Sequence, residues 1–234
     1  MLLFRYLPYI TQTPAAVLTV ILAFVVSMLV GLSVHEFSHA AVADRLGDHT
    51  ARRFGRLTLN PRAHLDPMGA LMIMFVGFGW AKPTPVNPYN TPRPRLSMVL
   101  IALGGPLSNL AIAFVAGLPL RLGIVDPSLS LARNPDASYL VGLFLTWMVS
   151  LNVTLAVFNL LPLAPLDGFR VLVGLLPPNL AREISKYEQW GPGILMLLFF
   201  LPFITGFNPL FTVMNPLLDF FTELAMGVRG GIFG

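Results

Sequence analysis

The chain has 234 residues, of which 55% are hydrophobic and only 11% are charged, and its mean hydropathy is +0.73. Soluble domains usually carry about 25% charged residues, so this composition excludes an ordinary soluble protein. Cysteine is absent, which excludes disulfides and thiolate metal ligands. The net charge of +4 does not predict nucleic-acid binding, because the basic residues flank apolar segments.

The first apolar segment, residues 14–44, predicts a long membrane helix. Pro14 suits the first turn of a helix, and Gly47 is a typical stop signal. A helix of about 30 residues is about 45 Å long, which exceeds the thickness of the hydrocarbon layer. We therefore expect one end of this helix to emerge from the bilayer.

The next stretch, residues 48–95, is rich in arginine, proline and glycine around an apolar island at 68–80. The island is too short to span a bilayer comfortably, so we expect a re-entrant or interfacial segment. Residues 53–59 and 81–87 have extended character on either side of it. The prolines of 81–87 are typical of an edge strand, because proline cannot donate to a ladder.

Two further apolar segments, 96–120 and 139–161, predict a second and a third core helix. A proline-rich break follows the third helix. The polar stretch 177–189 then precedes two more apolar segments at 194–205 and 208–228. We expect the last of these to lie in the membrane interface rather than to cross the bilayer.

These segments predict an all-α polytopic membrane protein. We see no internal repeat or low-complexity tract, and the length leaves no room for a sizeable soluble domain beside the spans. We therefore expect one membrane-embedded domain over residues 1–234, with a core at 14–175 and C-terminal apolar helices at 191–228. No oligomeric state is predicted.

The basic residues predict the orientation of the helices. They gather in the connections 45–95 and 162–192, whereas 121–138 holds only Arg121 and Arg133. The positive-inside rule therefore places 45–95 and 162–192 in the cytosol. As a consequence, the first and third core helices end on the same side of the membrane at similar depth.

A metal-binding motif lies near the end of the first predicted helix, in the pattern His-Glu-x-x-His. His35 and His39 are four residues apart, so both imidazoles project from one helix face and can bind one metal ion. Glu36 can reach a water on that metal as a general base. Polar residues inside an apolar span are costly and usually functional. The pattern predicts a zinc hydrolase site inside a membrane.

Asp167 is the predicted third ligand, because it lies at the break after the third helix, on the side where the first helix also ends. A carboxylate at membrane depth needs a partner, and zinc is a suitable one. Two histidines and one carboxylate with an open fourth position are typical of catalytic zinc. His64, beside Asp66 in a proline-rich loop, is the alternative third ligand.

Several motifs together resemble the site-2 proteases, the intramembrane zinc metalloproteases, in their short form without PDZ or CBS domains. The resemblance covers residues 15–175 and is looser beyond them. It rests on the two motifs above and on further blocks at Asn60–Gly69, Gly79–Pro83 and Gly104–Asn109. It implies a site-2 protease core with short re-entrant or β elements between the first two core helices.

The resemblance also implies roles for individual residues. His35, His39 and Asp167 would bind one zinc ion per chain, and Glu36 would activate water. Asn159, eight residues before Asp167, would hold substrate or the oxyanion, and Asn109 is a second candidate for that role. The expected enzyme is a zinc metalloendopeptidase that cleaves transmembrane helices of other membrane proteins, and its extended segments would bind the unwound substrate as an added strand.

The expected location is a prokaryotic cytoplasmic membrane, with the site toward the cytosol and the lipid bilayer and a substrate helix as partners. Three other functions are compatible with parts of the sequence. They are a non-catalytic membrane protein of the same fold, a metal transporter, and a membrane hydrolase that acts on a lipid or prenylated substrate. The presence of all expected ligands and of Glu36 argues against the first, and the clustering of polar residues at one depth argues against the second.

Overall fold

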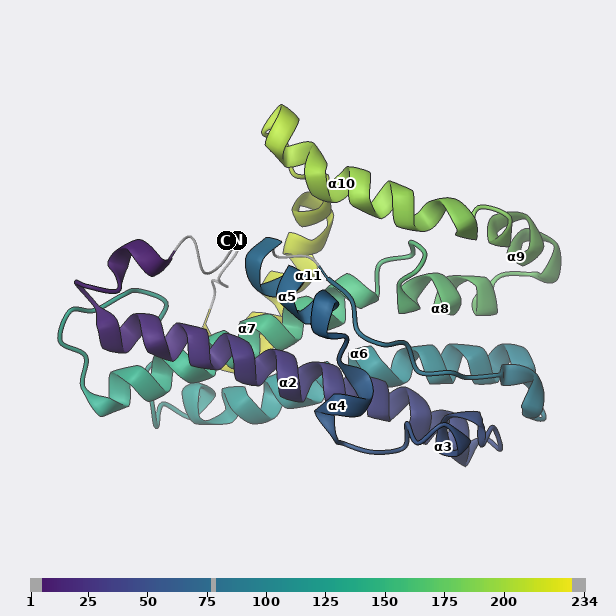
Figure 1. The fold of residues 1–234 in the computed structure, drawn as a ribbon, viewed down its shortest axis with the longest axis horizontal. Helices are drawn as coiled ribbons and strands as arrows, with labels where there is room; N and C mark the ends of the chain where they lie inside the picture. The colour runs from purple at the N-terminus through teal and green to yellow at the C-terminus, as the bar shows by residue number, and fades with distance from the viewer. Residues whose placement is uncertain (1–5, 77–78, 229–234) are drawn as a thin grey trace.

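The computed structural model describes residues 6–76 and 79–228, and the fold over these residues is helical (Figure 1). Three short 3-10 turns accompany the α-helices: η1 Leu7–Tyr9, η2 Pro88–Asn90 and η3 Glu188–Trp190. The α-helices are α2 Pro14–Arg45, α3 Thr50–Arg53, α4 Pro61–His64, α5 Pro67–Val76, α6 Pro94–Arg121, α7 Ala137–Asn159, α8 Asp167–Leu175, α9 Pro178–Ser185, α10 Gly191–Thr205 and α11 Pro209–Met226.

Four segments of the described chain are long and apolar enough to cross a membrane. They are Pro14–Arg45, Pro94–Arg121, Ala137–Asn159 and Pro178–Thr205. The first three are the predicted core helices α2, α6 and α7, which agree with the sequence expectation to within a few residues at each end. The predicted class, an all-α polytopic membrane fold, is confirmed.

The helices α2, α6 and α7 lie side by side and form the centre of the fold (Figure 1). Small residues allow the close contact between them. A Cβ atom added at Gly104 of α6 would lie 3.2 Å from the Ser38 carbonyl oxygen of α2, and one added at Gly31 would lie 2.8 Å from Asn152 Oδ1 of α7. Side chains at these positions would force the helices apart, as expected where small residues mediate helix packing in membranes.

The connection between α2 and α6 differs from the sequence expectation in two respects. Residues 53–59 do not form an extended strand, because α3 continues to Arg53 and turns follow it. Within the described residues a single antiparallel bridge, between Leu65 and Ala81, takes the place of a β-sheet. The prolines at 83, 85 and 88 explain why the ladder stops there, since each lacks a backbone donor.

Asp48 ties this connection to the end of α2. Its buried carboxylate accepts hydrogen bonds from the backbone N–H of Thr50 at 3.1 Å, from that of Asn87 at 2.5 Å, and from the Asn90 amide at 2.8 Å. Burial would raise the pKa of Asp48, but these hydrogen bonds and the Thr50 hydroxyl outweigh it and lower the pKa below its usual value. The extended segment that ends at Asn87 is therefore held beside α2.

The C-terminal helices pack unequally. α11 packs on α6 and α7 through buried residues that include Leu210, Met214 and Leu218. α10 extends away from the three core helices (Figure 1), and its apolar side chains are mostly exposed. α10 is part of the candidate span Pro178–Thr205, whereas α11 is not one of the candidate spans of the described chain. The interfacial placement expected for 208–228 stays a prediction.

Candidate metal centre

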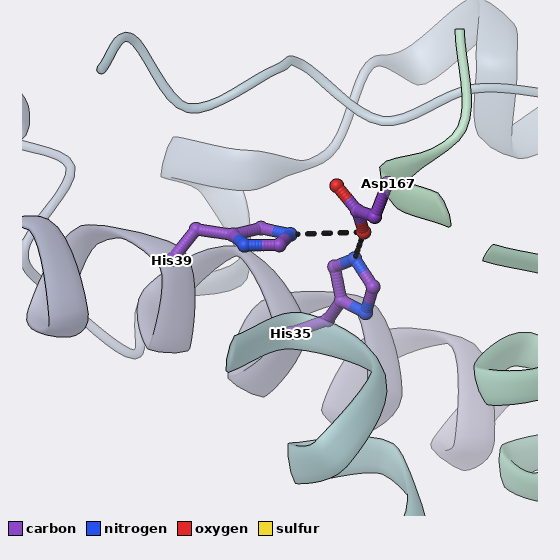
Figure 2. A group of neighbouring side chains, drawn as sticks. All are labelled: His35, His39 and Asp167. Carbon is purple, nitrogen blue, oxygen red and sulfur yellow. Dashed lines mark hydrogen bonds and ion pairs between the residues drawn. The ribbon is translucent and has the colours of Figure 1, made fainter. Parts of the chain in front are cut away.

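Three side chains converge where the C-terminal half of α2 meets the start of α8. His35 and His39 project from one face of α2 toward the Asp167 carboxylate (Figure 2). Asp167 Oδ2 lies 3.1 Å from His35 Nε2 and 3.2 Å from His39 Nε2. One ligand atom from each residue lies within 4.8 Å of the others, which is the spacing of a group that can hold a metal ion.

The turn after α7 delivers Asp167 to this position. α7 ends at Asn159, the chain turns through Pro162 and Pro165, and α8 begins at Asp167 itself. The next residue must be glycine, because a Cβ atom at Gly168 would lie 2.2 Å from the Leu160 carbonyl oxygen. The tight approach of α8 to the end of α7 thus places the carboxylate against α2.

The orientation of the His39 ring is fixed by a backbone group. His39 Nδ1 lies 2.6 Å from the carbonyl oxygen of Ile101 in α6. A carbonyl oxygen only accepts, so Nδ1 carries the proton and donates it. In the neutral ring Nε2 therefore has its lone pair free, and that atom faces Asp167.

The orientation of the His35 ring is fixed by a chain of two buried amides. His35 Nδ1 lies 2.6 Å from Asn109 Oδ1, and Asn109 Nδ2 donates to the Gly31 carbonyl and to Asn152 Oδ1, both at 3.1 Å. Asn152 Nδ2 in turn donates to the Met148 carbonyl at 2.9 Å. Because the two carbonyls accept only, both amide orientations are determined, and His35 Nδ1 must be the donor. Its Nε2 also presents a lone pair to Asp167.

This arrangement fits a divalent metal. Two Nε2 lone pairs and an ionised carboxylate are all acceptors, and they face one another in a buried place, where unpaired acceptors are costly. A cation bound between them removes that cost. A metal-binding histidine usually donates a hydrogen bond from its other ring nitrogen to a nearby oxygen, as both Nδ1 atoms do here. Two imidazoles and one carboxylate are also a known ligand set of catalytic zinc.

Gly105 of α6 keeps the space beside the two rings open. A Cβ atom at this position would lie 2.5 Å from His35 Nε2 and 2.5 Å from His39 Nε2. Any side chain would therefore occupy the place where the ligand atoms converge. The sequence analysis attributed no chemistry to this glycine, and only the helix packing shows that it lies over the rings.

Glu36 lies next to the metal group on α2 and is held by Thr84. The Thr84 hydroxyl is 2.6 Å from Glu36 Oε2, and the Thr84 backbone N–H donates to the same oxygen at 2.9 Å. Within the described residues Glu36 has no basic partner within ion-pair distance and Oε1 accepts no hydrogen bond. The carboxylate thus has one occupied and one open oxygen.

Comparisons with known proteins identify the family. The model of peptidase family M50 matches residues 122–201. YwhC of Bacillus subtilis, named as a zinc metalloprotease, is 41% identical over 180 residues, which cover 76% of this chain and 80% of YwhC. The chain belongs to peptidase family M50. This is the family of the site-2 proteases, which the motifs predicted.

Other M50 relatives carry the same description. Rip2 of Mycobacterium tuberculosis is 31% identical over 84% of this chain and 73% of its own length. MJ0611 of Methanocaldococcus jannaschii is 30% identical over 65% of this chain and 71% of its own length. Both are named as zinc metalloproteases. No solved structure matches the chain significantly.

Membership of M50 confirms three predictions. The protein is a metalloprotease, its metal is zinc, and with four apolar spans it is an integral membrane protein. The relatives are bacterial and archaeal, which agrees with a prokaryotic membrane. In the described chain, His35, His39 and Asp167 form a group that could hold this metal ion.

The structure places the other candidate residues differently. The buried His64 ring contacts the Thr58 carbonyl through Nε2 at 2.7 Å and lies outside the group of His35, His39 and Asp167. Asn159 donates to the Leu155 carbonyl of its own helix at 2.9 Å and is not hydrogen-bonded to the group. Its predicted role in substrate binding stays a prediction.

Asn109 has a contact that the sequence analysis did not anticipate. It was expected to hold substrate or an oxyanion, but both N–H bonds of its amide are used by Gly31 and Asn152. In this arrangement the amide oxygen of Asn109 contacts His35, and its predicted role in binding substrate or the oxyanion stays a prediction. No contact with the site was predicted for four further residues, because such contacts depend on how separate parts of the chain pack: Ile101, Gly105, Asn152 and Thr84.

Proposed function

We propose that this M50 zinc metalloprotease cleaves transmembrane segments of other membrane proteins within the membrane. The observation that carries the proposal is the location of the metal group. His35 and His39 lie on α2, a segment apolar enough to cross a membrane. A peptide bond can be hydrolysed there only if it enters the same layer, and the natural source of such a bond is another membrane segment.

In this proposal His35, His39 and Asp167 hold zinc and Glu36 is the general base. The chemistry that zinc supplies when bound is a more acidic water molecule and a polarised carbonyl group. The open Oε1 of Glu36 takes the proton of the attacking water, and the same carboxyl then protonates the leaving nitrogen. Asn109 and Ile101 keep the two rings turned toward the centre while this occurs.

The substrate must be extended before it can be cut, because the peptide groups of a helix are occupied by internal hydrogen bonds. The segment 81–87 offers a place for the extended chain. Within the described residues the carbonyl groups from Lys82 to Val86 accept no hydrogen bond. These groups can pair with a substrate strand, and the amide of Asn159 can hold it at the end of α7.

We further propose that the site opens toward the cytosol of a prokaryotic cell. The support is the excess of arginine and lysine in the connections 45–95 and 162–192; the first follows His39 in the sequence, and the second contains Asp167. Water can then reach the centre from the cytosolic side. The substrate would be cut near the cytosolic end of its membrane segment.

The proposed function is tested with purified protein in lipid bilayers and a panel of single-span peptides. We expect about one zinc per chain, cleavage of at least some peptides within their apolar segments, and loss of cleavage with phenanthroline that added zinc reverses. Peptides whose spans contain glycine or proline should be cut faster, because these residues weaken a helix by about 1 and 3 kcal/mol. Cleavage confined to soluble peptides or to lipid substrates, or metal uptake into sealed vesicles without cleavage, would contradict the proposal.

Replacement of Asn109 by leucine should weaken zinc binding by about 10- to 100-fold, the usual effect of losing an outer partner of a metal-binding histidine. The reason is that leucine leaves His35 Nδ1 without its acceptor. Competition with a chromogenic chelator measures the affinity. Asn215→Leu, at a partly buried amide on α11, is the control and should bind zinc like the wild type. Unchanged affinity in folded Asn109→Leu would show that Asn109 does not orient His35.

A further inference from the structure

We propose that Thr84 is the positioning residue for the Glu36 carboxylate, and that it leaves one oxygen of Glu36 directed to accept a proton. This inference rests on the proposed function, in which Glu36 is the general base. Thr84 belongs to the connection between α2 and α6, 48 residues away in the sequence. Neither the His-Glu-x-x-His motif nor the Asp-Gly motif includes it.

Thr84 contacts Glu36 at three points. Its hydroxyl lies 2.6 Å from Oε2 and 3.2 Å from the backbone carbonyl of Glu36, and its N–H donates to Oε2 at 2.9 Å. A hydroxyl has one proton, which serves the shorter contact to the carboxylate. Both neutral donors therefore meet the same oxygen. Hydrogen bonds to an ionised group are about twice as strong as neutral ones, so this pair can hold the rotamer of Glu36.

The local sequence prepares Thr84 for this contact. Pro83 and Pro85 flank it, so the Thr84 N–H is the single backbone donor of residues 83–85, and the structure uses it on Glu36. A residue before proline is restricted to extended conformations, and proline itself has a fixed φ. The donor pair is thus presented by a stiff backbone. A flexible loop would lose more entropy in forming the same two bonds.

The segment around Thr84 is anchored at both ends independently of Glu36. The Lys82 N–H donates to the His64 carbonyl at 2.7 Å, and the Asn87 N–H donates to Asp48 at 2.5 Å. Thr84 is itself buried, with 9% of its surface exposed. Because the anchors fix the segment, the contact with Glu36 is not needed to hold it in place. Removing the Thr84 hydroxyl should therefore change the position of the Glu36 carboxylate and leave the segment itself in place.

The test uses the full-length protein in bilayers with a peptide that the wild type cleaves. In Thr84→Val the hydroxyl is replaced by a methyl group of similar volume. We expect kcat to fall by about 10- to 100-fold, part of the 10²- to 10⁴-fold that a general base supplies. KM, zinc content and the melting temperature in detergent should stay close to wild-type values. Thr84→Ser, which keeps the hydroxyl, should recover most of kcat.

Thr91→Val is the matched control. Thr91 is equally buried, at 6% exposed, and lies in the same connection, but its hydroxyl contacts Pro88 and Ser97 rather than Glu36. Its kcat should match the wild type. The inference is overturned if Thr84→Val retains full kcat, if Thr84→Ser and Thr84→Val lose equal activity, or if the loss appears in KM or in zinc content.

A Glu36→Gln variant in the same assay distinguishes failure of the Thr84 inference from failure of the proposed role of Glu36. If Glu36→Gln is inactive and Thr84→Val is fully active, the inference about Thr84 fails and the proposed function stands. If Glu36→Gln cleaves like the wild type, the proposed role of Glu36 fails, and the positioning role of Thr84 fails with it.

Discussion

Replacing Glu36 by glutamine should reduce cleavage of a membrane peptide by about 10²- to 10⁴-fold, the contribution of a positioned general base. Glutamine keeps the length and shape of the side chain but cannot take a proton from water. Its amide oxygen can still accept both hydrogen bonds from Thr84, so the side chain should keep its place. The loss should fall on kcat, because the removed proton transfer belongs to the transition state.

Zinc content decides how this loss is interpreted. Glu36 is not in the group of His35, His39 and Asp167, so Glu36→Gln should retain about one zinc per chain by elemental analysis. Glu188→Gln, an exposed change on η3, should leave both activity and zinc unchanged. Full cleavage by a zinc-loaded Glu36→Gln protein would contradict the assignment of the base. Loss of zinc in this variant would instead place Glu36 among the ligands.

The three candidate ligands of the metal centre could be predicted from the sequence, because they depend on the spacing within one motif and on the orientation of the core helices. The spacing of His35 and His39 determines that both rings share a helix face. The topology then predicted that the break after the third core helix would lie at the same end, and the structure brings Asp167 to 3.1 Å from His35. One motif and one orientation argument were therefore sufficient to identify three candidate ligands.

The supporting contacts could not be predicted because they join helices that are distant in the sequence. Asn109 is 74 residues from His35, and its amide could equally have faced substrate. The packing of α2 against α6 and α7 places the Gly31 carbonyl and Asn152 Oδ1 next to its two N–H bonds, a contact that the sequence alone does not indicate. Gly105 is similar, since its absent side chain matters only because two rings lie beside it.

The error at residues 53–59 has a local cause. The sequence analysis gave weight to the extended character of the stretch, but Asp48 accepts hydrogen bonds from the Thr50 N–H and hydroxyl, and α3 starts at Thr50. These contacts hold the chain where it enters α3, although the N-cap residue His49 makes no side-chain cap bond. The edge strand expected at 81–87 is reduced to one bridge at Ala81, since the prolines that marked an edge strand also prevent a longer ladder.

Replacing Asp167 by asparagine should abolish the response of the protein to zinc while the fold is retained. In the metal-free wild type, the two Nε2 atoms and the carboxylate are three acceptors that face one another. Bound zinc removes this cost, and its binding should raise the melting temperature in detergent, since a ligand that binds only the folded state stabilises it. An asparagine amide at 167 can donate to the imidazoles instead of requiring a cation, so the metal-free variant should melt no lower than the metal-free wild type.

The measurement is a zinc titration followed by thermal unfolding and elemental analysis. Loss of a residue that hydrogen-bonds a metal ligand weakens metal binding by up to roughly 100-fold. We expect zinc affinity to fall by more than this in Asp167→Asn, because a charged ligand itself is lost. Activity should fall with occupancy. Asp219→Asn, an exposed change on α11, is the control and should keep the full zinc-dependent shift.

The same titration tests the alternative ligand His64. If Asp167→Asn still bound one zinc with the wild-type shift, the carboxylate would not be a ligand, and a second change, His64→Ala, should then remove the metal. If Asp167 is the ligand, His64→Ala alone should leave zinc binding intact, because the ring contacts the Thr58 carbonyl and lies outside the converging group. The outcome follows from geometry, since a metal ligand must place its donor atom about 2.0–2.3 Å from the ion. In this fold, Asp167 is the carboxylate that faces both Nε2 atoms.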